Sequence, residues 1–203
     1  MEEKTMKIIT LGPSSVGKTS IIERIINRKF DISEKPTVGF VVKSIKKFYK
    51  KKNLSITYEF FDTSGQEKFM NLLPKSYIRN SKIVLLVFDS LNTLEVLKGR
   101  WFSFYKDNCN IETSKFIVIA NKSDIFGDND EDIRELGREF ADEIDAPFLT
   151  CSAKSNDNIE NIFSNIQTEV QRLIKEENES YESNENFYLS PTTIQVSTQK
   201  SCC

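Results

Sequence analysis

The segment Gly12-Pro-Ser-Ser-Val-Gly17-Lys18-Thr19 has the residue types needed to hold a phosphate group. Its glycines let backbone N–H groups turn inward around phosphate oxygens, and the helix expected after it adds the positive end of its dipole. Lys18 would reach the β- and γ-phosphates, and Thr19 would hold Mg²⁺ through its hydroxyl. An ordinary glycine-containing turn is the plain alternative, but the strand–loop–helix context favours phosphate binding.

A second motif, Asp62-Thr-Ser-Gly65-Gln66-Glu67, follows an expected strand. An acidic residue at a strand end beside a phosphate loop is placed to hold the Mg²⁺ shell. Gly65 allows its N–H to approach a terminal phosphate, and Gln66 could orient an attacking water. By itself this motif is a common turn sequence. Its position after a strand and downstream of a phosphate loop favours the functional interpretation.

The third motif, Asn121-Lys122-Ser123-Asp124, follows another apolar run and precedes Cys151-Ser152-Ala153-Lys154. The Asp124 carboxylate can accept two hydrogen bonds from the N1–H and 2-amino edge of guanine, which adenine does not offer. Lys122 can cover the base plane with its aliphatic stem. The order of the motifs, each at a strand end, indicates a guanine nucleotide site at the carboxyl edge of a sheet.

Composition removes several other kinds of chemistry. The chain has 203 residues, no histidine and a net charge of -2, which excludes His-dependent catalysis and His-ligated metals and disfavours a nucleic-acid partner. Its four cysteines form no C-x-x-C pair, so a reducing compartment is expected. The first residues lack the apolar core of a signal peptide, Glu2 excludes N-myristoylation, and the longest apolar run, Ile83–Phe88, is too short for a membrane helix.

Apolar runs alternate with helical patterns along the chain. This alternation predicts an α/β fold with a mostly parallel sheet and helices on both faces. The expected strands are 7–11, 38–49, 54–61, 82–89, 115–120 and 147–151, and the expected helices cover 18–28, 93–107, 133–144 and 159–174.

From about Glu177 the sequence is polar and aperiodic. We therefore expect one folded domain over residues 1–176 and a flexible tail over residues 177–203.

Taken together, GPSSVGKT, Pro36-Thr37, DTSGQE, NKSD and SAK resemble the Ras-type small GTPases over residues 6 to about 175. Thr37-Val-Gly39, GQEKF, SYIRNS and the final Cys202-Cys203 resemble the Rab branch, and LLPKSYIRNS is most similar to Golgi-type Rabs. The resemblance implies a small G domain of the P-loop NTPase class with a six-stranded sheet. It also implies a Mg²⁺-dependent GTP/GDP switch that hydrolyses GTP in vesicle trafficking.

The resemblance implies roles for individual residues. Thr37 should bind Mg²⁺ and the γ-phosphate in the GTP form, with Thr19 and Asp62 completing the metal site, while Gln66 and Lys18 should be catalytic. Phe30 should pack edge-on against guanine. The other expected nucleotide contacts are Gly12, Ser14, Ser15, Val16, Gly17, Ser20, Gly65, Asn121, Lys122, Asp124, Ser152, Ala153 and Lys154.

The sequence departs from the Rab pattern at several positions. Phe61 stands where Rabs usually carry Trp, Val42 where they carry an aromatic residue, and Ser64 where they carry Ala. One extra residue lies between Phe69 and Tyr77. We expect these departures to affect partner choice and hydrolysis rate more than nucleotide binding.

Cys202 and Cys203 resemble a Rab double-geranylgeranylation site. Residues 175–203 hold two Lys and five Glu, and one lipid chain without a polybasic patch anchors a protein weakly, so two chains are expected. The resemblance implies an exchange factor, a GTPase-activating protein, a GDP-dissociation inhibitor or escort protein, and effectors that bind the switch regions. The expected location is the cytoplasmic face of an endomembrane, Golgi or endosomal, with a cytosolic pool.

Alternatives of other classes are a GTP-bound scaffold that does not cycle, another branch of the Ras superfamily, and a P-loop ATPase or kinase, against which Asp124 argues. The lysines between Lys43 and Lys52 favour a solvated edge hairpin over contact with anionic lipid. The aromatic residues from Trp101 to Tyr105 favour packing against the sheet over base stacking.

Overall fold

The computed structural model describes residues 1–33, 37, 39–65 and 78–188. By its internal contacts the chain divides into two compact units, Met1–Glu169 and Val170–Cys203. The division falls inside the last helix, whereas the sequence predicts a domain boundary at residue 176. The first unit contains the sheet, the Gly12–Thr19 motif, the described part of the Asp62–Glu67 motif, the Asn121–Asp124 motif and the segment Cys151–Lys154, whereas Cys202 and Cys203 belong to the second.

The sheet has six strands in the order β2-β3-β1-β4-β5-β6. Only β2 is antiparallel to its neighbour, so the expected mostly parallel α/β sheet is confirmed. The central strand β1 lies between β3 and β4, with Thr10 beside both Asp62 and Leu85. The strands are β1 Glu2–Leu11, β2 Phe40–Tyr49, β3 Leu54–Thr63, β4 Ile83–Phe88, β5 Lys115–Ala120 and β6 Phe148–Thr150.

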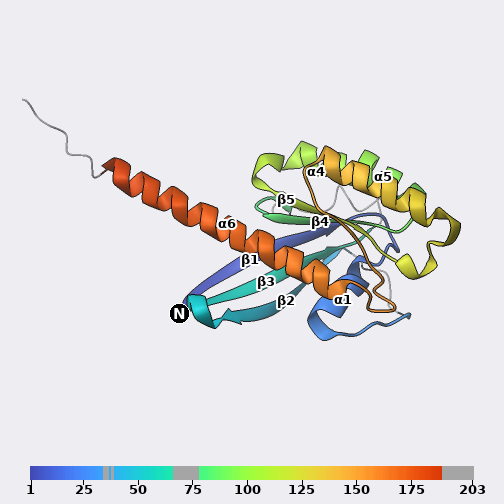
Figure 1. Ribbon diagram of the computed structural model, residues 1–203, viewed down its shortest axis with the longest axis horizontal. Helices are drawn as coiled ribbons and strands as arrows, with labels where there is room; N and C mark the ends of the chain where they lie inside the picture. The colour runs from blue at the N-terminus through green and yellow to red at the C-terminus, as the bar shows by residue number, and fades with distance from the viewer. Residues whose placement is uncertain (34–36, 38, 66–77, 189–203) are drawn as a thin grey trace, which may run out of the picture. The chain divides into compact units, whose positions relative to one another are not determined.

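Helices cover both faces of this sheet, as the alternating pattern predicts. Figure 1 shows α1 on one side and α4 and α5 on the other. The helices are α1 Lys18–Asn27, α3 Leu91–Val96, α4 Ser103–Asn108, α5 Asp130–Glu143 and α6 Ile159–Tyr188; a π-helical stretch, η3 Leu97–Phe102, joins α3 to α4. Short 3₁₀ turns are η1 Lys50–Lys52, η4 Ile111–Thr113, η5 Ser123–Ile125 and η6 Gly127–Asn129. In the described part of the chain, no helix has an apolar stretch that would span a bilayer.

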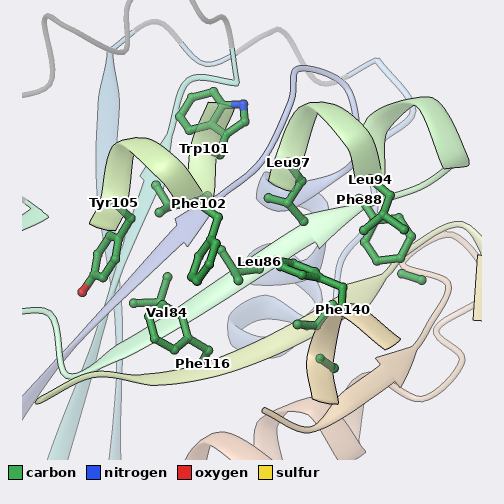
Figure 2. Close-up of a cluster of buried hydrophobic side chains, with 14 of the residues drawn as sticks. Val84, Leu86, Phe88, Leu94, Leu97, Trp101, Phe102, Tyr105, Phe116 and Phe140 are labelled. Atoms are coloured by element: carbon green, nitrogen blue, oxygen red, sulfur yellow. The ribbon is translucent and has the colours of Figure 1, made fainter. Parts of the chain in front are cut away.

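One core lies between the sheet and the helices α3, α4 and α5. Alternate residues of a strand face opposite sides, and Ile9 and Leu11 of β1 belong to this cluster. Aromatic rings fill it: Phe102 meets Phe116 and Phe140 edge to face, with centroids 5.5 Å apart in both pairs. Figure 2 shows these rings with Trp101 and Tyr105 above β4 and β5. The expected packing role of the aromatic helix is therefore confirmed.

The opposite face of the sheet packs against α1 and the beginning of α6. Ile21, Ile22 and Ile25 form the buried side of α1. Tyr58 of β3 meets Phe163 of α6 edge to face, with centroids 5.3 Å apart. The hydroxyls of Tyr58 and Tyr49 are hydrogen-bonded to each other. The Tyr49 hydroxyl also accepts a hydrogen bond from the side-chain amide of Gln167 at 2.8 Å. The two tyrosines therefore connect the β2–β3 hairpin to the first turns of α6.

Most bounds agree with the expected ranges within three residues, and three elements differ by more than that or in type. β1 begins at Glu2 instead of Lys7. Residues 2–6 are mostly polar, but they pair in register with residues 54–58 of β3. The helix expected over 93–107 contains the π-helical stretch, which periodicity does not resolve over six residues. α6 continues beyond Glu177. The ion pairs Arg172–Glu176, just before this point, and Lys175–Glu179, across it, support the helix at i,i+4 spacing.

Candidate nucleotide site

A cavity of about 480 Å³ opens at the carboxyl ends of the strands. Residues from all the motifs line it, so segments more than 130 residues apart in the sequence meet there. The lining residues are Ser14, Ser15, Gly17, Lys18, Thr19, Ser20, Phe30, Asp31, Ile32, Thr37, Thr63, Ser64, Gly65, Asn121, Lys122, Asp124, Ile125, Ala153 and Lys154. A pocket at this edge of an α/β sheet is where such folds bind ligands.

The phosphate loop connects β1 to the first turn of α1. Lys18 begins the helix, and its ammonium group donates to the carbonyls of Gly12 and Pro13 at 2.9 and 2.7 Å. Gly17 has φ +90°, and a Cβ there would collide with Nδ2 of Asn121. The loop therefore needs glycine at position 17. The Lys18 ammonium places a buried positive charge at the base of the cavity.

Oxygen atoms from three segments meet beside Lys18. The Thr19 hydroxyl donates to Oδ2 of Asp62 at 2.7 Å, and the Thr37 hydroxyl lies 3.1 Å from the Thr19 hydroxyl and 3.3 Å from the same carboxylate oxygen. Asp62 has no exposed surface. Burial raises the pKa of its carboxyl, while the Thr19 hydrogen bond and the charge of Lys18 act in the opposite direction.

The second carboxylate oxygen of Asp62, Oδ1, indicates that this cluster of oxygens suits a metal ion. Oδ1 is buried and has no hydrogen-bond partner among the described residues. A buried, unpaired carboxylate oxygen is unfavourable unless something compensates it. Two hydroxyls and a carboxylate supply the hard oxygen ligands that Mg²⁺ prefers, so the residues present suit that ion.

Gly65 closes the cavity from the side of β3. A Cβ at this position would collide with the carbonyl of Pro13 and lie 2.5 Å from Nζ of Lys18. The backbone between Ser64 and Gly65 can therefore lie against the phosphate loop only because Gly65 has no side chain. The neighbouring Ser64 donates its backbone N–H to the carbonyl of Gly39 at 2.8 Å, which joins the Asp62 motif to the segment after Thr37.

Asn121 joins the phosphate loop to the segment Cys151–Lys154. Its amide nitrogen donates to the carbonyl of Val16 at 2.8 Å, and its amide oxygen accepts from the backbone N–H of Ala153 at 3.1 Å. The thiol of Cys151 also approaches this oxygen, at 3.4 Å. Asn121 is only 2% exposed. One buried side chain thus fixes the spacing between the two ends of the cavity.

The Asp124 carboxylate is held at the far end of the cavity. Its Oδ1 accepts from the Ser152 hydroxyl at 2.5 Å, and Lys154 lies 3.8 Å from Oδ2. Ser152 is itself fully buried and its Oγ accepts from the backbone N–H of Ser155. These contacts orient the Asp124 carboxylate beside the space that a base would occupy.

Lys122 has left-handed backbone geometry, with φ +66°. Its ammonium group pairs with Oδ2 of Asp89 at 2.6 Å. Asp89 directly follows β4 and also accepts from the hydroxyl of Thr93 at 2.9 Å. The ion pair therefore fixes the Lys122 stem along one wall of the cavity.

Arg24 ties α1 to the segment after β6. Its guanidinium donates to the carbonyls of Ala153 and Lys154 at 2.6 and 2.8 Å, and its Cζ lies 5.6 Å from the centre of the Phe30 ring. A third hydrogen bond, from Nη1 to the carbonyl of Arg28, is 3.1 Å long. Phe30 and Ala153, both predicted from the sequence to meet guanine, are thus held by one side chain.

The cavity brings together most of the residues predicted from the sequence. Four described residues of the prediction, Gly12, Val16, Asp62 and Ser152, lie behind the lining rather than in it. Gln66, Cys202 and Cys203 lie outside the described residues, as does the extra residue near Phe69.

Sequence reasoning missed several contributors to the site, among them Asp31, Ile32 and Ile125, which line the cavity. Arg24 and Asp89 act through partners 129 and 33 residues away, which no local pattern indicates. Thr63 lines the cavity and donates its hydroxyl to the carbonyl of Thr10 at 2.6 Å. The only available signal was its place inside the Asp62–Glu67 motif.

The departures from the Rab pattern fall on two kinds of position. Phe61 and Ser64 are buried, and the ammonium of Lys7 lies 4.5 Å from the centre of the Phe61 ring. Val41 and Val42 are each 44% exposed on β2. The changed aliphatic residue Val42 is therefore on the surface, where a partner would meet it.

Comparison with known proteins agrees with this geometry. The family model described as "Ras family" matches residues 7–172. The "Ras-related protein SEC4" of Candida albicans (strain SC5314 / ATCC MYA-2876) is 31% identical over 176 residues, covering 85% of this chain and 80% of that protein. The protein of the same name from Saccharomyces cerevisiae (strain ATCC 204508 / S288c) is also 31% identical over 176 residues, covering 85% of this chain and 78% of its own length.

Proposed function

The chain belongs to the Ras family, in its Rab branch of small GTPases that act in vesicle trafficking, and we propose how its own residues carry out the switch. One observation carries the proposal: a single cavity joins a loop suited to phosphates with a carboxylate suited to guanine. In it, GTP would lie with its phosphates against Lys18 and its base beside Asp124. The Ala153 N–H, which donates to Oδ1 of Asn121, would be shared between that oxygen and the guanine carbonyl, and Phe30 would pack edge-on against the base.

Thr19, Thr37 and Asp62 would hold Mg²⁺, since their oxygens already cluster and Oδ1 of Asp62 has no described partner. When bound, the ion would offset the charge of the β- and γ-phosphates. In this proposal Thr37 takes part only when the γ-phosphate is present.

Hydrolysis converts GTP and water to GDP and phosphate. Water attacks the γ-phosphorus in line, and the bond from that phosphorus to the β–γ bridging oxygen breaks. Lys18 places its charge beside the oxygens where negative charge develops, the backbone of Gly65 adjoins the γ-phosphate, and Gln66 orients the water. No arginine lines the described cavity, so we expect slow intrinsic turnover and an activating protein that accelerates it on the order of 10⁵-fold.

Loss of the γ-phosphate would release the segments that contain Thr37 and Gly65, and this release is the switch. An exchange factor, a GTPase-activating protein, a GDP-dissociation inhibitor or escort protein, and effectors would recognise the two states. The exposed Val41 and Val42 would contribute to the effector surface. We propose no nucleic-acid partner.

Geranylgeranyl groups on Cys202 and Cys203 would attach the protein to the cytoplasmic face of an endomembrane, Golgi or endosomal. Each chain contributes ~0.8 kcal/mol per buried CH₂, and two chains anchor a protein stably where one does not. Membrane fractionation of the Cys203→Ser and double Ser variants tests this step, since the double variant should be wholly cytosolic while still binding GTP.

Single-turnover phosphate release from purified protein tests the proposed chemistry. GTP, but not ATP, should be hydrolysed, and Gln66→Leu should keep GTP binding while losing the stimulated rate. Asp124→Asn should shift preference from guanine to xanthine nucleotides, because the amide reverses the hydrogen-bonding pattern at that edge. A guanine preference retained by Asp124→Asn in competition binding would contradict the assigned role of Asp124, and GTP bound without turnover would favour a scaffold that does not cycle.

A further inference from the structure

The tip of the β2–β3 hairpin carries a concentration of positive charge that the nucleotide site does not use. Lys50, Lys51 and Lys52 form the 3₁₀ turn η1, and Phe48 precedes it on β2. We call these four residues the hairpin patch, which leaves out Lys47 because its ammonium lies over the Phe163 ring on the other face of the sheet. The three lysines of the turn are exposed, and Phe48 is 61% exposed.

This patch differs from the lysines nearer the site. Lys43 pairs with Glu23 at 2.6 Å and Lys46 pairs with Glu3 at 2.8 Å, so those charges are largely offset. Lys50 and Lys51 make no ion pair within the residues that the structure describes. Adjacent like charges repel one another, so Lys50 and Lys51 carry a cost that no ion pair of the described residues offsets.

The backbone of the tip is nevertheless fixed. Asn53 adopts the left-handed conformation with φ 47°, and its N–H donates to the carbonyl of Lys50 at 3.2 Å. Its carbonyl accepts from the N–H of Glu2 at 3.0 Å, which connects the turn to β1. The lysines are therefore presented from a preorganised turn, which reduces the entropy lost on binding.

Protection of an exposed sheet edge does not account for the patch. Lysines that protect an edge lie along the strand, as Lys43 and Lys46 do, whereas η1 is a turn with no free ladder to protect. A largely exposed phenylalanine beside that edge acts against protection, because it adds apolar surface. Exposed lysines that follow an exposed phenylalanine at a hairpin tip instead match an anionic bilayer, whose head groups attract cations and whose interface accepts aromatic side chains.

We propose that the hairpin patch binds the surface of a membrane containing anionic lipids. The ten residues of β2 span roughly 33 Å, so this contact lies far from the nucleotide cavity and leaves it open. Lysine is suited to a fluid array of phosphate and carboxylate groups, because it acts as a flexible point charge and needs no paired geometry. The inference adds to the proposed lipid anchor and does not depend on it.

The test uses the full chain with Cys202→Ser and Cys203→Ser, so that no lipid group contributes. Vesicles of phosphatidylcholine with about 30% phosphatidylserine should bind this protein at about 25 mM salt and release it by about 150 mM salt, so the patch alone does not hold the unlipidated protein on a membrane at cellular ionic strength. Replacing Lys50, Lys51 and Lys52 with Ala should weaken binding by about fivefold per lysine, or roughly 100-fold in all. Phe48→Thr should weaken binding further while keeping a residue that favours strands.

A matched control replaces three exposed lysines elsewhere, Lys29, Lys106 and Lys175, with Ala and so makes the same change in net charge. The control should bind vesicles like the parent, and all variants should release GDP at the parent rate. Equal loss in both triple variants, or equal binding to pure phosphatidylcholine, would overturn the inference. Retention on poly-glutamate without binding to vesicles would also overturn it, in favour of an acidic protein partner.

Discussion

Replacement of Asn121 by alanine tests whether this side chain holds the two ends of the cavity together. The amide is the hydrogen-bond partner of the Val16 carbonyl at 2.8 Å and of the Ala153 N–H at 3.1 Å. Both partners are almost completely buried. Asn121→Ala leaves a carbonyl and an N–H without the side chain that satisfies them.

The expected magnitude follows from those two groups. An unsatisfied buried polar group costs about 1–3 kcal/mol, and the neighbouring cavity lets water reach part of this region, so we expect about 2–4 kcal/mol in total. Each 1.4 kcal/mol corresponds to a factor of about ten in binding. If the loss appears in the nucleotide complex, the dissociation constant for GDP should rise by about 30-fold or more.

Stopped-flow release of a fluorescent GDP analogue measures the effect on nucleotide binding. The melting temperature of the GDP-loaded protein measures how much of the cost falls on the stability of the fold. Asn108→Ala is the matched control, because it also removes an amide donor 2.8 Å from a carbonyl, that of Phe104, away from the cavity. The control should change GDP release by less than about twofold, as expected for a site outside the binding region. Equal GDP release by the two variants would refute the bridging role of Asn121.

Three further predictions concern single residues. Arg24→Gln should speed GDP release by about tenfold, because two charge-assisted hydrogen bonds to the segment after β6 are lost; unchanged release would show that the segment holds its position without Arg24. Gly65→Ala should weaken GTP more than GDP in competition binding, because the added Cβ collides with Pro13 and crowds Lys18; equal loss of both nucleotides would contradict this. Burial raises the pKa of Cys151 to about 12, so at pH 8 its thiolate is scarce and mass spectrometry should find it unalkylated until the protein unfolds. Rapid alkylation of folded protein would show that the thiol is accessible.

The local chemistry of the site is determined by the sequence alone. The glycines around Val16, the carboxylate at Asp62 and the polar string ending at Asp124 each follow a strand whose apolar pattern is visible without a structure. Parallel strands place their carboxyl ends at one edge, so the order of the motifs was enough to predict that they meet. The structure confirms the meeting for the described residues.

Tertiary structure decided how these pieces are fixed to one another. Arg24 reaches Ala153 and Asn121 reaches Val16 across more than a hundred residues of sequence. Hydrophobic periodicity reports which face of an element is buried, but it carries no information on the partner of a single polar side chain. Such partners follow from the final positions of whole elements, which the sheet order sets.

The same reason explains the elements whose ranges differed. The polar start of β1 is a strand because β3 offers it a ladder of backbone partners from Leu54 onward, and backbone pairing does not depend on side-chain type. In the same way the lysine-rich turn was visible in the sequence, but its fixed geometry depends on Asn53 bonding to Glu2. The sequence determined which groups are available, and long-range backbone pairing decided where they are held.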